Sequence, residues 1–74
     1  MEKVYDSHPA PYTLHRRSHA GVYTLMGEFE TDYVEFAFRD CIQDHTGSRV
    51  WVTDKDGIII ESYDPDHDDY LDFA

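Results

Sequence analysis

The most constraining feature of this chain is one stretch with helical periodicity, which lies between two pairs of segments with the composition of β-strands. Asp32 and Glu35 have the spacing of a capping box at its start, and Gly47 suits a C-terminal cap. The sequence therefore predicts one helix with a single apolar side. At about 100° per residue, that side contains Val34, Ala37, Phe38, Cys41, Ile42 and His45.

Four segments rich in β-branched and aromatic residues surround this helix, at residues 12–17, 22–29, 48–53 and 58–63. Gly21 suits the turn of the first pair, and Asp54–Gly57 suits a type I hairpin turn with Gly57 in the left-handed conformation. Gly27 indicates a bulge, and the unbroken triplet Ile58–Ile60 indicates a strand buried on both faces. The order predicts an α+β fold: one small two-layer ββαββ domain with an antiparallel sheet and one helix.

The length of 74 residues predicts a single domain over residues 1–74. Residues 1–10, with Pro9 and the following Pro11, are expected to form an extended leader, and residues 64–74 an acidic tail. The lone Cys41 excludes an internal disulfide and favours a reducing, cytoplasmic location. No apolar run approaches the roughly 20 residues that cross a bilayer, so no membrane partner is expected.

The formal net charge of −10 is concentrated in the second part of the chain. Residues 1–27 contain two acids and three bases, whereas residues 28–74 contain fourteen acids and three bases. Such a surface repels phosphate backbones and attracts cationic partners, which excludes a basic DNA-binding domain. Like charges also destabilise a small core. We therefore expect either a partner that neutralises the acids or self-association that enlarges the core.

Aromatic side chains among the acids mark the candidate binding residues. Phe36 points with the polar side of the helix, and Tyr33 lies three residues before it. A single exposed aromatic residue is common and needs no functional explanation. The acidic tail at residues 64–74 can also be explained simply, either as a solvated segment or as a segment that folds over Tyr33 and Phe36. The functional interpretation is that these aromatic residues and the acids around them form a protein–protein interface. Its predicted contacts are Glu28, Glu30, Tyr33, Glu35, Phe36, Asp40, Asp66, Asp68, Asp69 and Tyr70.

The sequence gives only weak indications of metal binding, catalysis or phosphate binding. The acids around His67 match no fixed ligand pattern. A calcium loop with Gly57 at its sixth position fails because Val52 would be at the first position and Tyr63 at the twelfth, where carboxylates are required. No metal and no cofactor are expected. Cys41 lies on the apolar side of the helix, which favours a small buried hydrophobe over a nucleophile, and no catalytic motif is present. The basic stretch Arg16–Arg17, between His15 and His19, favours a charge-balancing turn over a phosphate site, and His45 is expected to be structural.

In size, acid excess and its lone cysteine, the chain resembles the small acidic inhibitors that phages and mobile elements encode, including DNA mimics of the anti-restriction and anti-CRISPR type. The resemblance carries no residue-level sites, and it implies inhibition of a nucleic-acid-handling protein or complex through its basic groove. The preferred prediction is a non-enzymatic protein of this kind that binds no nucleic acid directly. The alternative is an adaptor domain docking on a basic protein surface. Either acts as a monomer or a homodimer.

Overall fold

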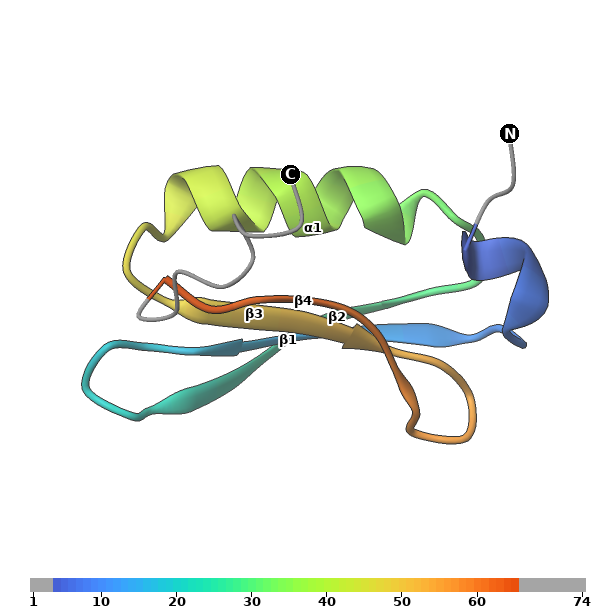
Figure 1. The fold of residues 1–74 in the computed structure, drawn as a ribbon, viewed down its shortest axis with the longest axis horizontal. Coiled ribbons are helices and arrows are strands. Elements are labelled where there is room, and N and C mark those ends of the chain that lie inside the picture. Colours follow the sequence, from blue (N-terminus) through green and yellow to red (C-terminus); the bar gives the residue numbers. More distant parts are fainter. Residues whose placement is uncertain (1–3, 66–74) are drawn as a thin grey trace.

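The computed structural model describes residues 4–65 and confirms the predicted ββαββ order (Figure 1). A short 3-10 helix, η1 (Val4–Ser7), precedes β1 (Tyr12–Arg17) and β2 (Tyr23–Phe29). The helix α1 (Val34–Asp44) follows, and then β3 (Arg49–Thr53) and β4 (Ile59–Tyr63). Each strand lies within one residue of its predicted start.

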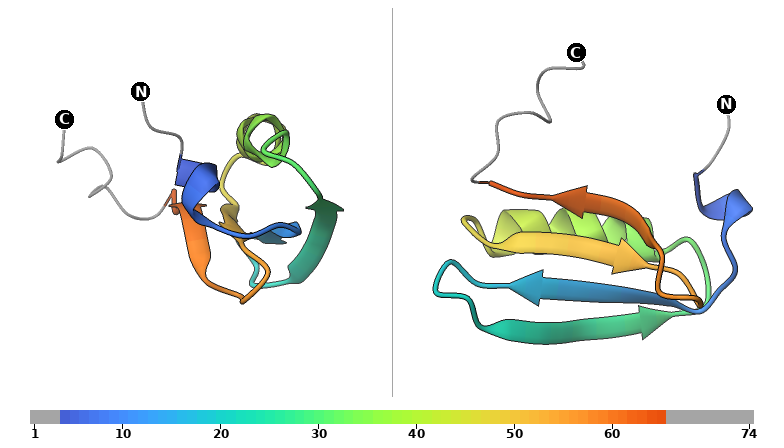
Figure 2. Two further views of the ribbon diagram at one scale, coloured as in Figure 1. Left: turned by 90° about the vertical axis from the view of Figure 1, so that its right-hand side faces the viewer. Right: turned by 60° about the horizontal axis from the view of Figure 1, so that its bottom comes forward.

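The four strands form one antiparallel sheet in the order β2-β1-β3-β4, and α1 covers one face of it (Figure 2). Pairing of β1 with β3 places Leu14 opposite Val52. The core between sheet and helix takes Leu14, Val50 and Val52 from the strands, and Val34, Phe38 and Cys41 from the helix. The apolar side predicted for the helix is therefore the side that is buried.

Each edge strand contains a bulge. In β2, Leu14 lies opposite Gly27 and His15 opposite Leu25, so Met26 is the extra residue, beside the glycine that predicted it. In β4, the pairing shifts in the same way between Glu61 and Ile59.

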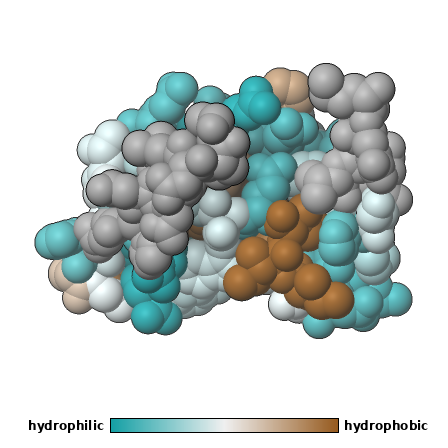
Figure 3. All heavy atoms as spheres, in the orientation of Figure 1, coloured by the Kyte–Doolittle hydropathy of each residue, from teal (hydrophilic) through white to brown (hydrophobic). Residues whose placement is uncertain are grey.

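The prediction that the isoleucine triplet is buried on both faces is wrong. Ile58 is 55% exposed and Ile59 is 58% exposed. The physical reason is topological, because β4 is an edge strand and no described residue forms a layer over the sheet face opposite α1 (Figure 2). The exposed isoleucines account for the apolar patch at the start of β4 in Figure 3.

The predicted capping box is also wrong. The N-cap position is Tyr33, which has helical dihedral angles (φ −56°, ψ −21°) and makes no side-chain cap hydrogen bond. The Glu35 carboxylate instead accepts a hydrogen bond of 3.0 Å from the Arg39 guanidinium, one turn along the helix. At the other end, the C-cap is His45, two residues before the predicted Gly47, and Gly47 has a positive φ of +88° in the turn that follows.

The extended leader predicted for residues 1–10 is wrong over residues 4–7, which form η1. Tyr5 is buried there and packs edge-on against Tyr12, with ring centroids 5.2 Å apart. The Tyr12 hydroxyl lies 3.0 Å from the Tyr5 carbonyl and 2.8 Å from the His8 carbonyl. The segment folds back because Tyr5 closes an end of the core that a domain this small cannot leave open.

The β3–β4 turn holds this N-terminal segment in place. Asp54 is buried, and its Oδ1 accepts hydrogen bonds from the amides of Asp56 (2.8 Å) and Ile58 (3.0 Å), while Gly57 has the predicted positive φ of +84°. Its Oδ2 lies 2.9 Å from His8 Nδ1. Burial by itself raises the pKa of Asp54, but the hydrogen bonds from Ile58, His8 and Asp56 outweigh it, so the pKa lies below its ordinary value.

Candidate functional site

Three aromatic side chains form a row where β2 passes into α1, and we call Phe29, Tyr33 and Phe36 the aromatic ridge. The ring centroids of Phe29 and Tyr33 are 6.2 Å apart, and those of Tyr33 and Phe36 are 5.8 Å apart. Tyr33 is 60% exposed and Phe36 is 58% exposed. The structure thus confirms that Phe36 lies outside the core and brings it together with Tyr33, as the three-residue spacing predicts.

The carboxylates predicted to accompany these aromatics do not all lie beside them. Glu30 follows Phe29 directly and is exposed, and Asp40 is exposed one helical turn after Phe36. Glu35 is held in its ion pair with Arg39. Glu28 lies opposite Thr13, which alternation in β1 places on the sheet face turned away from the helix. Only Glu30 and Asp40 therefore flank the aromatic ridge as the binding hypothesis expects.

The remaining predicted contacts, Asp66, Asp68, Asp69 and Tyr70, lie outside the described residues. Asp64, at the start of the predicted tail, accepts a hydrogen bond of 2.8 Å from the Arg49 guanidinium. At least one tail carboxylate is thus used within the protein itself.

Glu61 is an acidic residue that the fold partly buries. It pairs with Val52 in the sheet and so lies on the face covered by α1. Burial raises the pKa of Glu61 above its ordinary value, although the neighbouring Tyr5 hydroxyl opposes this. Burial likewise raises the pKa of Tyr5, and the charge of Glu61 adds to the effect. Glu61 is therefore a partly buried acid on the helix-covered face of the sheet and is less available for a charged contact than a fully exposed one.

The sheet face opposite α1 carries a second candidate surface, which sequence reasoning missed. The rings of His15 and Trp51 are stacked, with centroids 5.1 Å apart and an interplanar angle of 7°. Tyr23 lies beside both, 5.8 Å from the His15 ring and 6.1 Å from the Trp51 ring. Alternation in residues 48–53 separates Trp51 from the buried valines, but the partner of Trp51 depends on the β1–β3 pairing, which no local pattern contains.

Both ring nitrogens of His15 have partners on this face. Nδ1 lies 2.8 Å from the Tyr23 hydroxyl, and Nε2 lies 2.8 Å from Thr53 Oγ1. Burial lowers the pKa of His15 below its ordinary value of 6.5, which favours the neutral ring. His15 therefore acts as an aromatic element of the sheet surface and not as part of a basic patch.

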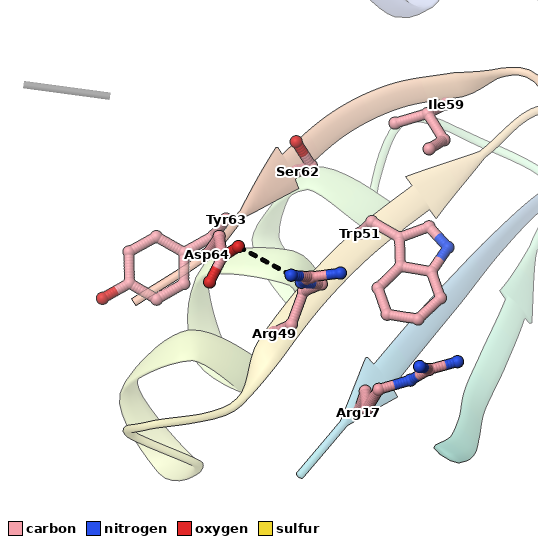
Figure 4. A pocket seen from close by; sticks show the side chains of 7 residues that line it. All are labelled: Arg17, Arg49, Trp51, Ile59, Ser62, Tyr63 and Asp64. Carbon is pink, nitrogen blue, oxygen red and sulfur yellow. Dashed lines mark hydrogen bonds and ion pairs between the residues drawn. The ribbon is translucent and has the colours of Figure 1, made fainter. Parts of the chain in front are cut away.

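A cleft of about 490 Å³ lies at the β3–β4 side of the same face (Figure 4). Trp51 and Ile59 supply apolar walls, while Arg17 and the Arg49–Asp64 ion pair supply charge; Ser62 and Tyr63 complete the lining. The cleft is open to solvent and combines an aromatic wall with cations, which suits a side chain of a docking partner.

The single cysteine and the distribution of possible metal ligands complete the account of residues 4–65. Cys41 is buried, and burial raises the pKa of its thiol above the ordinary value, which disfavours a reactive thiolate. Within the described part of the chain, no three His, Cys, Asp or Glu side chains are grouped as metal ligands would be. No helix among these residues has the length and apolar character needed to cross a membrane.

Comparisons of the chain with protein-family models, with curated proteins and with solved structures find no match.

Proposed function

We propose that this protein is a non-enzymatic acidic binding protein that inhibits a nucleic-acid-handling protein or complex by docking in its basic groove. The observation that carries the proposal is the aromatic ridge, where Tyr33 and Phe36 are more than half exposed at the start of a helix that bears carboxylates. Large aromatic side chains fixed by their neighbours anchor interfaces at low entropic cost. This role belongs in the cytoplasm, where the groove would be found.

In this mechanism the charge and the aromatics have separate tasks. The net charge of −10 steers the protein toward a cationic groove and raises the association rate. Phe36 and Tyr33 then bury their rings against the partner and slow dissociation. Glu30 and Asp40, which flank the ridge, meet Lys or Arg side chains that otherwise hold phosphates. Binding is therefore expected to weaken with salt and to exclude nucleic acid from the same groove.

The second candidate is an adaptor that docks on a cationic protein surface unrelated to nucleic acid. One specific observation favours it. Glu35 is paired with Arg39, Glu61 is partly buried, and Glu28 lies on the other face of the sheet, so these three carboxylates do not add free charges to a row beside the ridge. An adaptor needs only the ridge and a few neighbouring acids.

The decisive experiment captures partners from a native lysate with three forms of the full chain. These are the wild type, the ridge variant Tyr33→Ala/Phe36→Ala, and a matched control, Leu25→Lys, which alters an exposed apolar residue on the sheet face. The proposal expects a basic protein that is captured by the wild type and the control and lost with the ridge variant. Equal capture by all three forms overturns it.

A competition step separates the two candidates. The captured protein is saturated with the wild-type chain, and double-stranded DNA or RNA is then added at constant ionic strength. Mutual displacement supports inhibition through the basic groove. A ternary complex in which neither ligand weakens the other rejects inhibition and leaves the adaptor.

A further inference from the structure

The four strands lie side by side in one sheet (Figure 2), and their pairing arranges the residues of the face opposite α1 in three rows that cross the strands. The first row is cationic, with Arg17 between Tyr23 and Arg49. The central row is largely apolar, and the third row contains one acid, Glu28. In full, the rows are Tyr23–Arg17–Arg49, Leu25–His15–Trp51–Ser62 and Glu28–Thr13–Thr53–Ile59.

We propose that this face binds a second copy of the same chain, sheet against sheet, about a two-fold axis that runs along the central row. Rotation about that axis places Trp51 and Leu25 of one copy against the same residues of the other. It also places the first row of each copy over the third row of its partner. Two sheets packed in this way lie about 10 Å apart, with their side chains interdigitated.

Charge complementarity selects this arrangement. The rotation sets the cationic row containing Arg17 over the row containing Glu28 of the second copy. A two-fold axis parallel to the strands would instead set the cationic row of one copy over the cationic row of the other, with Arg17 facing Arg49, which is unfavourable for like charges. The same operation carries the exposed Ile59 of one copy toward the Arg49–Asp64 side of the other, where the cleft lies.

The charge balance of the face argues for a copy of the chain over a nucleic acid. The three rows hold two arginines and one carboxylate, and Asp64 neutralises Arg49, so the face is close to neutral. The whole chain carries −10, which repels a polyphosphate at any orientation. Face-to-face pairing leaves the acidic helices on the two outer sides, where their mutual repulsion is smallest.

The area of the face sets the strength expected. Four strands about 4.8 Å apart and about 20 Å long have a flat outline of roughly 400 Å². Side-chain relief and the exposed turn residues Val22 and Ile58 enlarge this area. The surface buried by both copies then amounts to about 1,000 Å², which is the lower end for a specific interface. We therefore expect a reversible dimer that forms as concentration rises.

The test measures the mass of the full chain by sedimentation equilibrium from about 5 µM to about 500 µM, a range that brackets a weak interface. The wild type is expected to pass from 8.7 kDa to twice that mass. Leu25→Lys is expected to raise the dissociation constant about tenfold or more, because it sets two charges against each other in the central row. A wild-type chain that stays monomeric throughout overturns the proposal, and so does a Leu25→Lys variant that dimerises equally well.

Charge reversal tests the axis itself. Arg17→Glu and Glu28→Arg are each expected to weaken the dimer, and the double variant Arg17→Glu/Glu28→Arg is expected to restore it. The two positions are separated by four residues along β1, about 13 Å, so they form no pair within one copy. Rescue therefore reports contact between copies. Failure of the double variant to recover, with an unchanged melting temperature, overturns the two-fold arrangement.

Two controls keep the outcome independent of the partner proposed for the helix side. Tyr33→Ala/Phe36→Ala is expected to dimerise like the wild type, since the aromatic ridge lies at the β2–α1 connection and not in the three rows. Trp51, the single tryptophan, reports directly on the sheet face through its fluorescence. A fluorescence change on adding a single-stranded oligonucleotide to monomeric protein would assign the face to a different occupant and overturn the dimer.

Discussion

The two sides of this small domain expose apolar side chains in different arrangements. On the helix side, the aromatic ridge projects beside acids on a rigid element whose opposite side forms the core. On the sheet side, Trp51, His15 and Tyr23 contact one another, and the apolar residues spread across four strands. An isolated ridge among charges suits insertion into another protein. A broad, nearly neutral face suits packing against a surface like itself.

This difference also separates stability from binding. On the helix side, Tyr33 and Phe36 are more than half exposed, so their loss should affect a partner more than the protein. The sheet-side rings and hydrogen bonds belong to the fold itself, since His15 joins β1 to both Tyr23 and Thr53. Substitutions on the two sides should therefore give opposite patterns of melting and binding.

The largest contrast is expected between two phenylalanines on α1. Phe38 is 7% exposed and lies in the core, so Phe38→Ala should cost about 3–5 kcal/mol of unfolding free energy. Phe36→Ala should stay within about 0.5 kcal/mol of the wild type, because its side chain is 58% exposed and its ring lies beside the exposed Tyr33. Urea denaturation followed by circular dichroism measures both. A large loss for Phe36→Ala would show that the ridge is part of the packing and not a contact surface.

The same pair of residues shows what sequence periodicity can settle. The burial of Val34, Phe38 and Cys41 and the exposure of Phe36 follow from the 3.6-residue repeat alone, and Gly57 follows from turn chemistry. These features depend on residues that are near one another in the sequence. Whether Tyr33 and Phe36 bind a partner stays a prediction.

Features that depend on the order of the strands could not be predicted from local sequence patterns. The isoleucine triplet has the composition of a central strand, but β3 pairs with β1 and leaves β4 at the edge. The stacking of His15 on Trp51 joins residues from hairpins on either side of the helix. Tyr5 enters the core because the hydrogen-bonded network of Tyr12, His8 and Asp54 turns the N-terminal segment back. Such long-range pairings decide which faces remain open, and thus where the second candidate surface lies.

A smaller loss of stability is expected on the sheet side. Trp51→Ala removes the stack with His15 and the contact with Tyr23, which should cost roughly 1–3 kcal/mol, less than a core phenylalanine because Trp51 is only partly buried. Capture of the basic partner should persist as long as the variant is folded. If Trp51→Ala left stability unchanged but abolished that capture, the assignment of the two sides would be reversed. Thermal melting alongside partner capture checks both.

A weaker, pH-dependent effect should distinguish the sheet side from the helix side. The pKa of His15 is lowered in the folded state, so the unfolded chain binds a proton more readily. The stability from the neutral ring is present above the ordinary pKa of 6.5 and decreases as the pH falls below it. His15→Gln should flatten this part of the pH profile of the unfolding free energy. A profile that keeps its slope in this variant would assign the effect to another group.

The smallest change in stability is expected for Arg39→Ala, and this substitution also tests how the helix side contributes to binding. Arg39 is exposed, and its ion pair with Glu35 spans one helical turn, so Arg39→Ala should cost only about 0.3–0.5 kcal/mol. The substitution also frees the Glu35 carboxylate and removes a positive charge near the aromatic ridge. Binding to a cationic groove should therefore tighten, most clearly at low salt. Weaker binding would mean that Arg39 itself contacts the partner and that the partner does not recognise the helix side through its acidic residues alone.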